Sequence, residues 1–300
     1  MTVESRSVAA PDRVADPLPS VSVVIPAYNR PDYLAIAVES ALAQTVRPIE
    51  VIVVDDCSSV DLWPAISGFG DAVRYERLEN GRGACFARNR GISLATGDVI
   101  GFLDDDDAWM PEKTERQLAA LMHGAEAAIC GYNILHDPGR LYVQSIEQVD
   151  EDLLRLGNHF CGSSGLIAWR SVLLETGWDD ELPNGQDWDI FIRLAKRAPL
   201  AYVAEPLFRF RREGQQSIVS TSIEQSPDDL LKTALVAEKH RAWLGERNYR
   251  LRLAVYLLRF LGRRRSKLPF IWHAIKRAGL VPALHVLYRK IRGRDSMPKL

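Results

Sequence analysis

The sequence predicts an α/β protein with a largely parallel sheet, followed by a basic helical extension. Three observations predict it. Apolar, β-branched runs alternate with helical patterns between residues 21 and 103. Those runs are apolar almost without interruption, as in strands that are buried on both faces. Beyond residue 225 the strand patterns stop, and helical patterns rich in Lys and Arg take their place.

Local patterns predict the elements of the sheet region. Val21–Ile25 is a β-branched run that stops at Pro26, which is typical of a buried strand. From residue 31 to residue 44, apolar residues recur at helical spacing. The predicted strands are residues 21–25, 51–54, 73–78, 99–103 and 200–203; the predicted helices are 31–44 and 84–95, with further strand and helix material at 166–174 and 189–198.

The C-terminal part is predicted to be helical. The helices are expected at residues 231–243, 250–261, 270–277 and 281–291. In the second of them Arg252 and Arg259 are expected to lie outside the apolar face. We therefore predict a flexible N-terminal tail at residues 1–19, an α/β domain at 20–225 and a basic helical region at 226–300.

Charge is distributed unevenly along the chain. The net charge is only −1, but residues 239–300 carry 17 Lys and Arg against two acids, which leaves about −16 for the rest. A basic tail on an acidic body favours an anionic partner. Basic amphipathic helices are typical of proteins that lie on anionic membrane surfaces, but they also pack on a domain or a second subunit. Both alternatives stay open, and no nucleic-acid partner is expected because no reading motif accompanies the charge.

Cysteine spacing and hydropathy predict the cellular location of the protein. The four cysteines form no CxxC pair, so neither a zinc site nor a disulfide framework is expected. Reduced thiols fit the cytosol. Neither a signal peptide nor an apolar stretch long enough to span a membrane is expected. These features predict a cytoplasmic protein, peripheral to the inner face of the cell membrane if the basic helices bind lipid.

Four consecutive aspartates, at positions 104–107, directly follow the predicted strand 99–103. Adjacent carboxylates repel one another unless a cation neutralises them or some of them hold protons. Oxygen ligands of this kind suit Mg²⁺ or Mn²⁺. The alternative is a solvated acidic loop, which is what most charge runs are. The position favours a site, because ligands of open α/β sheets bind beyond the carboxyl ends of the strands.

Two other loops are expected at the same edge of the sheet. After the first strand, Tyr28 has a ring that can stack on a base. After the second strand, Asp56 can accept a hydrogen bond from a base or a ribose. The alternative for Asp55 and Asp56 is that they make a turn or cap a helix.

Two further patterns need interpretation. Asp187 and Asp189 precede an amphipathic helix; either they favour the positive end of its dipole, or one of them is a general base. Gly81-Arg82-Gly83 superficially matches a dinucleotide fingerprint, but Phe86 stands where the third glycine belongs. We therefore do not expect NAD binding.

Five segments together resemble family 2 glycosyltransferases, in that family's order and spacing, over about residues 20–215. The segments are VSVVIPAYNR at 21–30, EVIVVDDCS at 50–58, ARNRG at 87–91, FLDDDDAW at 102–109 and GQDWD at 185–189. The resemblance implies a GT-A fold and inverting transfer of a sugar from a nucleoside diphosphate donor, most often a UDP-sugar. It also implies a Mn²⁺ or Mg²⁺ cofactor and an acceptor on a glycan or a lipid-linked saccharide, as in cell-envelope polysaccharide biosynthesis.

The resemblance also implies roles for individual residues. Asp187 would be the catalytic base, and Asp104 and Asp106 the DxD pair, with Asp106 on the metal and Asp104 towards the ribose and the metal. The nucleotide-sugar would contact the following residues: Pro26, Ala27, Tyr28, Asn29, Asp56, Arg88, Asp104 and Asp105.

The chain departs from the family pattern in two places. Gln186 replaces the usual Glu, and residues 208–214 lack the usual histidine, so Arg211 or Arg212 is expected to meet the diphosphate instead. The alternatives are a nucleotidyltransferase and a catalytically inactive nucleotide-sugar-binding protein of the same fold.

Overall fold

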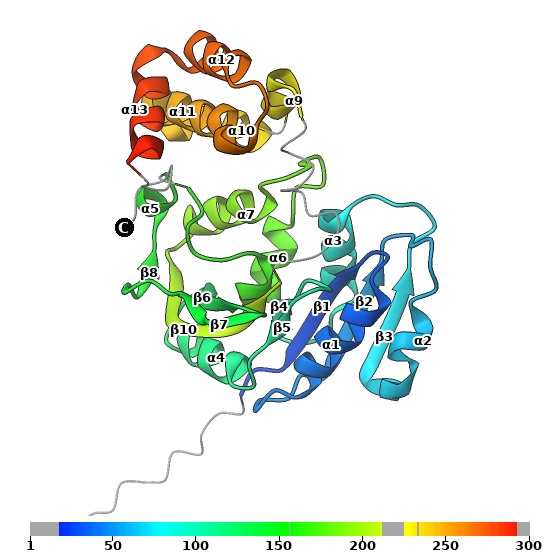
Figure 1. Cartoon of the computed structure of the whole chain (residues 1–300). Helices are drawn as coiled ribbons and strands as arrows, with labels where there is room; N and C mark the ends of the chain where they lie inside the picture. Colours follow the sequence, from blue (N-terminus) through cyan, green and yellow to red (C-terminus); the bar gives the residue numbers. More distant parts are fainter. Residues whose placement is uncertain (1–17, 156, 212–224, 233, 293–300) are drawn as a thin grey trace, which may run out of the picture.

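The computed structural model describes residues 18–155, 157–211, 225–232 and 234–292 (Figure 1). An α/β body carries a group of helices on one side. The strands are β1 (Val21–Ala27), β2 (Glu50–Asp55), β3 (Val73–Arg77), β4 (Val99–Phe102), β5 (Ala108–Trp109), β6 (Ala127–Ile134), β7 (Asp137–Tyr142), β8 (Gln148–Val149), β9 (Ile167–Trp169) and β10 (Leu200–Phe210). The helices of the body are α1 (Pro31–Leu42), α2 (Trp63–Ile66), α3 (Ala84–Leu94), α4 (Lys113–Met122), α5 (Glu151–Arg155), α6 (Arg170–Thr176) and α7 (Gln186–Ala195), with short 3-10 turns at Ser67–Ala72 and Ser163–Gly165.

The N-terminal half of the sheet is parallel, as predicted. Its strands run in the order β3-β2-β1-β4, and the register places Ala27 beside Asp55 and Val24 beside Phe102. The side chains of β1 and β4 are buried along their whole length. The carboxyl ends of β1, β2 and β4 therefore meet at one edge of the sheet.

The second half of the sheet is mixed, which the sequence pattern did not predict. β9 runs antiparallel to β4 and to β6, and β10 runs parallel to β6. The predicted strand 200–203 is only the start of β10, which has eleven residues and continues past two register shifts around Pro206. Proline lacks an amide hydrogen and interrupts the ladder there, which hides the second half of the strand from a pattern search.

Helix α3 approaches the sheet closely because of a glycine. A Cβ at Gly91 would lie 2.3 Å from a methyl carbon of Val24 on β1, so no side chain fits between this helix and the strand. Helices α4 and α7 both contact β10, and Figure 1 shows them on opposite sides of the sheet. The sheet is thus covered on both faces, as its apolar strands require.

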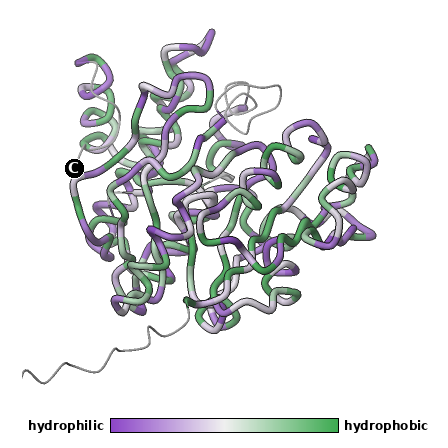
Figure 2. The backbone as a smooth tube through the Cα atoms, turned by 90° about the horizontal axis from the view of Figure 1, so that it is seen from below, coloured by the Kyte–Doolittle hydropathy of each residue, from purple (hydrophilic) through white to green (hydrophobic). Residues whose placement is uncertain are grey.

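The C-terminal helices form a separate layer at the top of Figure 1. They are α9 (Pro227–Lys232), α10 (Leu235–Lys239), α11 (Arg241–Leu258), α12 (Leu268–Ala278) and α13 (Leu280–Ile291), with a 3-10 turn at Leu261–Arg263. Figure 2, seen from below, shows hydrophobic and hydrophilic residues alternating along the chain throughout the molecule. The predicted tail at residues 1–19 lies outside the described residues, apart from residues 18 and 19.

One prediction for these helices is wrong. Arg252 does not lie outside the apolar face of its helix, because its side chain is buried, with 6% of the residue exposed. Its guanidinium carbon lies 4.7 Å from the ring centre of Trp188 on α7. Helix α11 therefore turns this arginine towards the α/β body, where an aromatic face receives the cation.

Candidate active site

Four aspartates in a row make two kinds of contact. Asp105 and Asp107 point into the protein and are buried. Asp105 accepts hydrogen bonds from the Tyr28 backbone N–H (2.9 Å) and from Arg30 Nη1 (2.6 Å). Asp107 accepts from Ser164 Oγ (2.6 Å) and from the Arg211 backbone N–H (2.9 Å). These two carboxylates fasten the loop. Burial raises the pKa of Asp105 to about 7 and that of Asp107 well above its usual range.

Asp104 and Asp106 are partly open to solvent, each with 29% of its side chain exposed. Asp104 pairs with Arg88 Nη2 at 2.7 Å and accepts from Ser163 Oγ at 2.8 Å. Asp106 pairs with Arg30 Nη1 at 2.9 Å, and burial raises its pKa. The alternation along the loop thus leaves the first and third carboxylates at the surface, and these are the two that we predicted as the DxD pair.

Arginines neutralise the aspartates in this structure. Arg30 bridges Asp105 and Asp106, and the buried Arg88 pairs with Asp104. Within the described residues, no group of three or more His, Cys, Asp or Glu side chains is arranged to hold a metal ion by itself. Protein sites for Mg²⁺ commonly supply only one or two carboxylates and leave the other positions to substrate phosphates and water. Asp104 and Asp106 fit a shared site of that kind.

Asp187 lies in the first turn of α7, opposite the aspartate loop. Its carboxylate accepts a hydrogen bond from the Ser163 backbone N–H, and its nearest charges are Arg88 and Asp104. Burial raises the pKa of Asp187 to about 6, although Arg88 acts in the other direction. A carboxyl group poised near neutral pH suits proton transfer.

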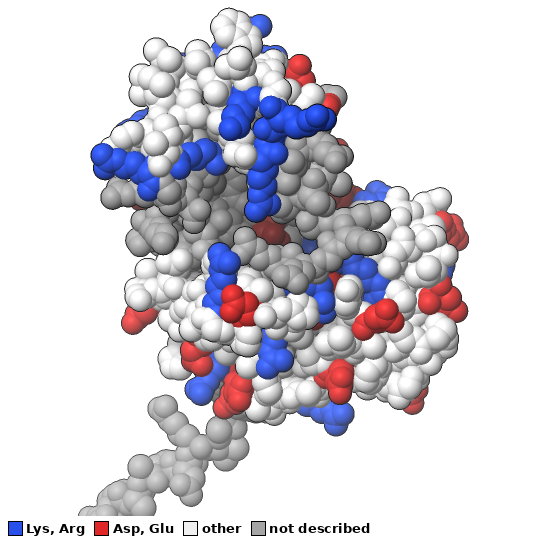
Figure 3. Space-filling model, viewed as in Figure 1, with Lys and Arg blue, Asp and Glu red and all other residues white. Residues whose placement is uncertain are grey.

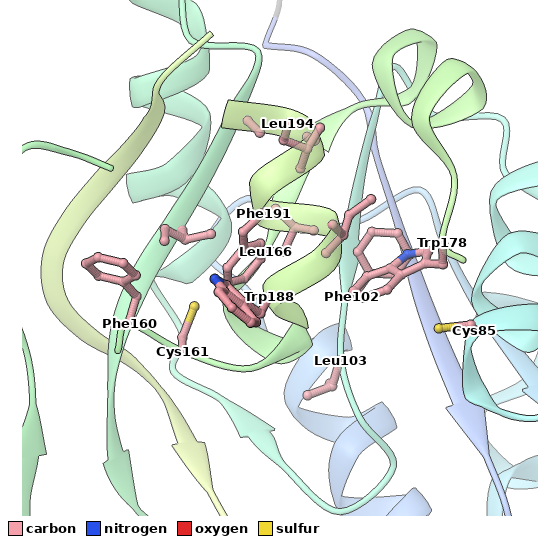
Figure 4. Packing of buried hydrophobic residues seen from close by; sticks show 14 of the residues in the cluster. Cys85, Phe102, Leu103, Phe160, Cys161, Leu166, Trp178, Trp188, Phe191 and Leu194 are labelled. Carbon is pink, nitrogen blue, oxygen red and sulfur yellow. The ribbon is translucent and has the colours of Figure 1, made fainter. Parts of the chain in front are cut away.

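The apolar face of α7 orients Asp187. Trp188, Phe191 and Leu194 are buried in the core, and Figure 4 shows Trp188 and Phe191 beside Leu166. The indole N–H of Trp188 also donates to the backbone oxygen of Leu154 at 2.8 Å. Because these side chains fix the rotation of the helix, Asp187 is left facing the loop that contains Ser163.

Asp189 has a different role from Asp187. It is fully buried, and its carboxylate contacts Arg193 Nε (2.8 Å), Lys239 Nζ (2.7 Å) and His240 Nε2 (2.8 Å). Burial alone would raise the pKa of Asp189, but hydrogen bonds from His240 and Lys239 and the charge of Arg193 lower it to about 2. The structure therefore separates the two candidates that the sequence left open: Asp187 faces the site, and Asp189 joins α7 to α10.

Arg88 connects the two sides of the site. Its Nη2 donates to Asp104 and to Ser163 Oγ (3.0 Å), and its Nη1 donates to Gln186 Oε1 at 3.3 Å. The guanidinium lies over the ring of Trp178, 4.6 Å from its centre. Trp178 in turn packs edge-on against Phe102 in the core. Gln186, which departs from the family's usual Glu, thus retains a contact with this arginine.

The remaining predicted residues lie at the ends of β1 and β2. Pro26 and Ala27 end β1 and are buried, while Tyr28 is 54% exposed beside them. Asn29 has a positive φ of 57°, and its Oδ1 accepts from the Ser59 backbone N–H at 2.7 Å. The side chain of Asn29 is therefore used to join two loops.

Asp55 and Asp56 make the contacts that the turn-or-cap alternative describes. Asp55 accepts from the Ser58 backbone N–H at 2.9 Å. Asp56 accepts from the backbone N–H groups of Arg82 and Gly83, both at 2.7 Å. Asp56 thus holds the loop before α3, where the apparent dinucleotide fingerprint lies. It stays next to Tyr28 in the fold because the Asp56 N–H donates to the Ala27 oxygen at the end of β1.

Several contributing residues were not predicted. Arg30 lies three residues after β1. Its place in a loop at the same sheet edge as the aspartates was the available signal. Ser163 and Ser164 lie in a stretch without any motif, so no feature of the sequence indicated a role for them.

One of the two arginines expected to meet the diphosphate lies beside the aspartate loop. Arg211 donates from Nε to the backbone oxygen of Asp106 at 3.0 Å. Arg212 lies outside the described residues.

The cysteines take no visible part in the site. All four are free thiols, and Cys85, Cys130 and Cys161 are buried. Burial raises the pKa of Cys85 to about 12 and that of Cys130 to about 11. The three buried thiols therefore pack in the interior of the protein.

The sequence of this chain is similar to those of known glycosyltransferases. The model of the family described as "Glycosyl transferase family 2" matches residues 22–173, about half of the chain. An uncharacterized glycosyltransferase of Rickettsia felis is 29% identical over 233 residues, which are 73% of this chain and 38% of the relative. The putative colanic acid biosynthesis glycosyl transferase WcaA of Escherichia coli is 30% identical over 188 residues, covering 59% of this chain and 66% of the relative. The putative teichuronic acid biosynthesis glycosyltransferase TuaG of Bacillus subtilis is 36% identical over 125 residues, covering 40% and 50%.

The fold matches a solved structure over most of its length. The crystal structure of residues 1–349 of TarS from S. aureus in complex with UDP-GlcNAc has a TM-score of 0.63 and 17% identity, and the match covers 92% of both chains. At this identity the likeness concerns the fold alone, and it confirms the predicted GT-A fold with its helical C-terminal region. Because the family model matches half of the chain and the fold agrees, this chain belongs to glycosyl transferase family 2.

Proposed function

We propose that this chain is an inverting, metal-dependent glycosyltransferase. It moves a sugar from a nucleoside diphosphate donor, a UDP-sugar, to a hydroxyl group of a glycan or lipid-linked acceptor. The observation that carries the proposal is the position of Arg88. This one buried guanidinium pairs with Asp104 on the donor side and contacts Gln186, next to Asp187, on the other.

Each part of the reaction has residues suited to it. Tyr28 and Asp56 offer a ring and a carboxylate for the base, at the ends of β1 and β2. Asp187, with its pKa raised to about 6 by burial, is ionised at neutral pH and can take the proton of the acceptor hydroxyl. A single displacement at the anomeric carbon inverts it, so no enzyme nucleophile is required.

The metal would be held by Asp106 and Asp104 together with the donor's phosphates, in keeping with the small number of carboxylates that reach the surface. When bound there, a divalent cation stabilises the charge that develops on the leaving diphosphate. Arg211, which reaches the backbone of Asp106, is placed to add positive charge on the same side.

The printed names of several relatives support an acceptor in cell-surface polysaccharide biosynthesis. They refer to teichuronic acid, to colanic acid and, for ExoO of Rhizobium meliloti at 41% identity over 128 residues, to succinoglycan. The solved TarS complex contains UDP-GlcNAc, which supports a UDP-sugar donor. Since this chain spans only part of most of these relatives, its own donor and acceptor are proposals.

The decisive experiment measures nucleoside diphosphate release and product formation with a panel of UDP-, GDP-, dTDP- and CDP-sugars. Asp187→Asn and Asp106→Ala are the test variants, and Asp137→Asn, an exposed residue of β7, is the matched control. We expect transfer by the wild type and the control only, with the opposite anomeric configuration in the product. Transfer by both test variants at the wild-type rate would refute the proposal. Pyrophosphate release would instead indicate a nucleotidyltransferase, and donor binding without turnover an inactive binding protein.

We also propose that the C-terminal helices lie on an anionic membrane surface. Among the described helices none is long and apolar enough to cross a membrane. Helices α12 and α13 nevertheless expose large apolar side chains, including Trp272 (61%), Val281 (78%) and Ile291 (85%). Lys276, Arg277 and Arg289 lie in the last turns of the same two helices. Apolar residues that insert among headgroups, combined with cations that meet lipid phosphates, are the features of an interfacial helix.

A further inference from the structure

A cavity of about 440 Å³ lies between the α/β body and the C-terminal helices. The first turn of α7 forms one wall, with Asp187 and Trp188. The end of α11 and the residues that follow it form the other, with Arg252, Tyr256, Arg259 and Phe260, and Lys290 of α13 completes the lining. Figure 3 shows Lys and Arg side chains gathered on the C-terminal helices above the body. The carboxylate that we propose as the base is thus part of a cavity whose other wall is basic.

The charge of this cavity is unbalanced. Its described lining contains three basic side chains, Arg252, Arg259 and Lys290, and one acidic side chain, Asp187. A second cavity, of about 610 Å³ among the C-terminal helices, has three acidic and three basic residues in its described lining: Asp228, Glu238, Glu246, Arg241, Arg250 and Arg277. The described lining of the cavity at Asp187 is therefore more basic than that of the second cavity.

Arg252 is built into the cavity. Its guanidinium is stacked on Trp188, and the backbone at Gly157 leaves room for it. A Cβ at residue 157 would lie 1.7 Å from Arg252 Nη2, and the φ of Gly157 is +116°. Burial lowers the pKa of Arg252 to about 10 and also lowers that of Arg259. An anionic ligand in the cavity would interact favourably with both cations.

The backbone beside the cavity is also unusual. Phe260 has a φ of 58°, in the left-handed region that an aromatic residue rarely adopts. Its ring lies 4.8 Å from the guanidinium carbon of Arg259. Strained residues of this kind often occur at ligand sites, where the surrounding structure holds them in place. Here the strained turn presents both the ring and the neighbouring cation to the cavity.

We propose that this cavity is the acceptor subsite and that it selects an anionic saccharide, one that bears a phosphate or a carboxylate group. The inference rests on the proposed function, since it takes Asp187 as the base that receives the acceptor's proton. Arg252, Arg259 and Lys290 would hold the anionic group while Asp187 faces a hydroxyl of the same saccharide. The family resemblance implies that Asp187 is the base, whereas the three cations belong to the C-terminal region of this chain.

The test compares binding of matched saccharides by saturation-transfer NMR, with and without UDP. Methyl glucuronide is paired with methyl glucoside, and glucose phosphate with glucose. Arg259→Gln and Lys290→Gln are the test variants. Arg250→Gln is the control, because Arg250 lies on α11, the helix that Arg259 directly follows, but lines the other cavity and pairs with Glu246. Thermal denaturation checks that each variant is folded.

We expect the wild type and Arg250→Gln to bind the anionic member of at least one pair about tenfold more tightly than the neutral member. In both test variants this preference should fall to about twofold or less. A preference limited to the glucuronide identifies a carboxylate, and one limited to glucose phosphate identifies a phosphate. Equal binding within both pairs, or an unchanged preference in both test variants, would overturn the inference.

The binding measurement does not depend on sugar transfer. The proposed function and the proposed acceptor subsite can therefore be refuted independently of each other. An anion preference in a protein that transfers no sugar would contradict the proposed function and leave the anion site. Sugar transfer without any anion preference would leave the function and contradict the subsite.

Discussion

The carboxylate of Asp189 lies 2.8 Å from Nε2 of His240, deep in the contact between α7 and the C-terminal helices. The same oxygen is 2.7 Å from Lys239 Nζ. Asp189 is only two residues from Asp187, and it joins the helix of the candidate base to the region that forms the other wall of the cavity. Asp189 therefore links the C-terminal helices to α7, the helix that carries the candidate base.

Asp189→Asn should destabilise the protein strongly. The substitution leaves Arg193 without its buried counter-charge, while Lys239 keeps its pair with Asp179. Breaking a buried pair costs about 3–5 kcal/mol. Denaturant unfolding measures the loss. Glu246→Gln is the control, because its pairs with Arg241 and Arg250 are exposed to solvent and contribute little to stability. Equal losses in the two variants would contradict a special role for the buried carboxylate.

The lowered pKa of Asp189 predicts how the stability of the protein depends on pH. Its pKa is lowered to about 2 in the folded protein and is about 3.9 in an unfolded chain. The stability that it contributes is therefore present above about pH 4 and is lost as the pH falls towards 2. Unfolding measured across this range should show a smaller loss in Asp189→Asn than in the wild type.

Activity should depend on the protonation of Asp187. Because burial raises its pKa to about 6, kcat/KM should fall below that pH as the base gains a proton, and should level off above it. Asp187→Asn should lower kcat by about 10²–10⁴-fold. Asp180→Asn, at an exposed acid that pairs with Arg82, should keep both the rate and the profile. A flat profile between pH 5 and pH 8 would argue against Asp187 as the base.

Much of the site could be predicted from the sequence because its residues follow directly from buried strands. Asp104 and Asp106 come after β4, and the alternation of side chains along the loop places both at the surface. The sequence pattern could not predict which neighbouring residues neutralise these two carboxylates. Arg88 is 16 residues from Asp104 in sequence but only 2.7 Å away in the fold. Such pairs depend on how α3 packs against the sheet, and no local pattern encodes that packing.

The C-terminal region was harder to predict for the same reason. Helical spacing indicated its helices, but the faces were assigned on the assumption that arginine faces water. Arg252 is buried because Trp188 of another element offers an aromatic face and Gly157 offers space. The long-range contact overrides the local polarity, and the cavity beside Asp187 follows from it.

Divalent cations should strengthen nucleotide binding through Asp106. In a thermal-shift assay, a nucleoside diphosphate with Mn²⁺ or Mg²⁺ should raise the melting temperature, because a ligand that binds only the folded state stabilises it by mass action. EDTA should remove most of this shift. Asp106→Asn should reduce the shift and its sensitivity to EDTA, whereas Asp137→Asn should behave as the wild type. Equal wild-type shifts with and without EDTA would contradict a metal at this loop.

Gly157→Ala should disturb Arg252. The new Cβ would collide with Arg252 Nη2, and the φ of +116° is unfavourable for alanine, so we expect a loss of about 1–3 kcal/mol. Gly68→Ala is the matched control, because a Cβ there meets no atom within 4 Å and the φ is not positive; its effect should stay within about 0.5 kcal/mol. If Gly157→Ala were as stable as the control, Arg252 would not be held in the position described.

Binding to lipid vesicles should require the exposed apolar residues of α12 and α13. We expect the wild type to sediment with vesicles that contain phosphatidylserine and much less with pure phosphatidylcholine, because each Lys or Arg near an anionic surface contributes about 1 kcal/mol. Added salt should weaken the binding by screening these charges. The double variant Trp272→Glu, Val281→Glu should remain in the supernatant, since it replaces two inserting side chains with anions. Val60→Glu, at an exposed apolar residue of the α/β body, should sediment like the wild type. Sedimentation of the double variant at the wild-type level would mean that these helices contact something other than lipid.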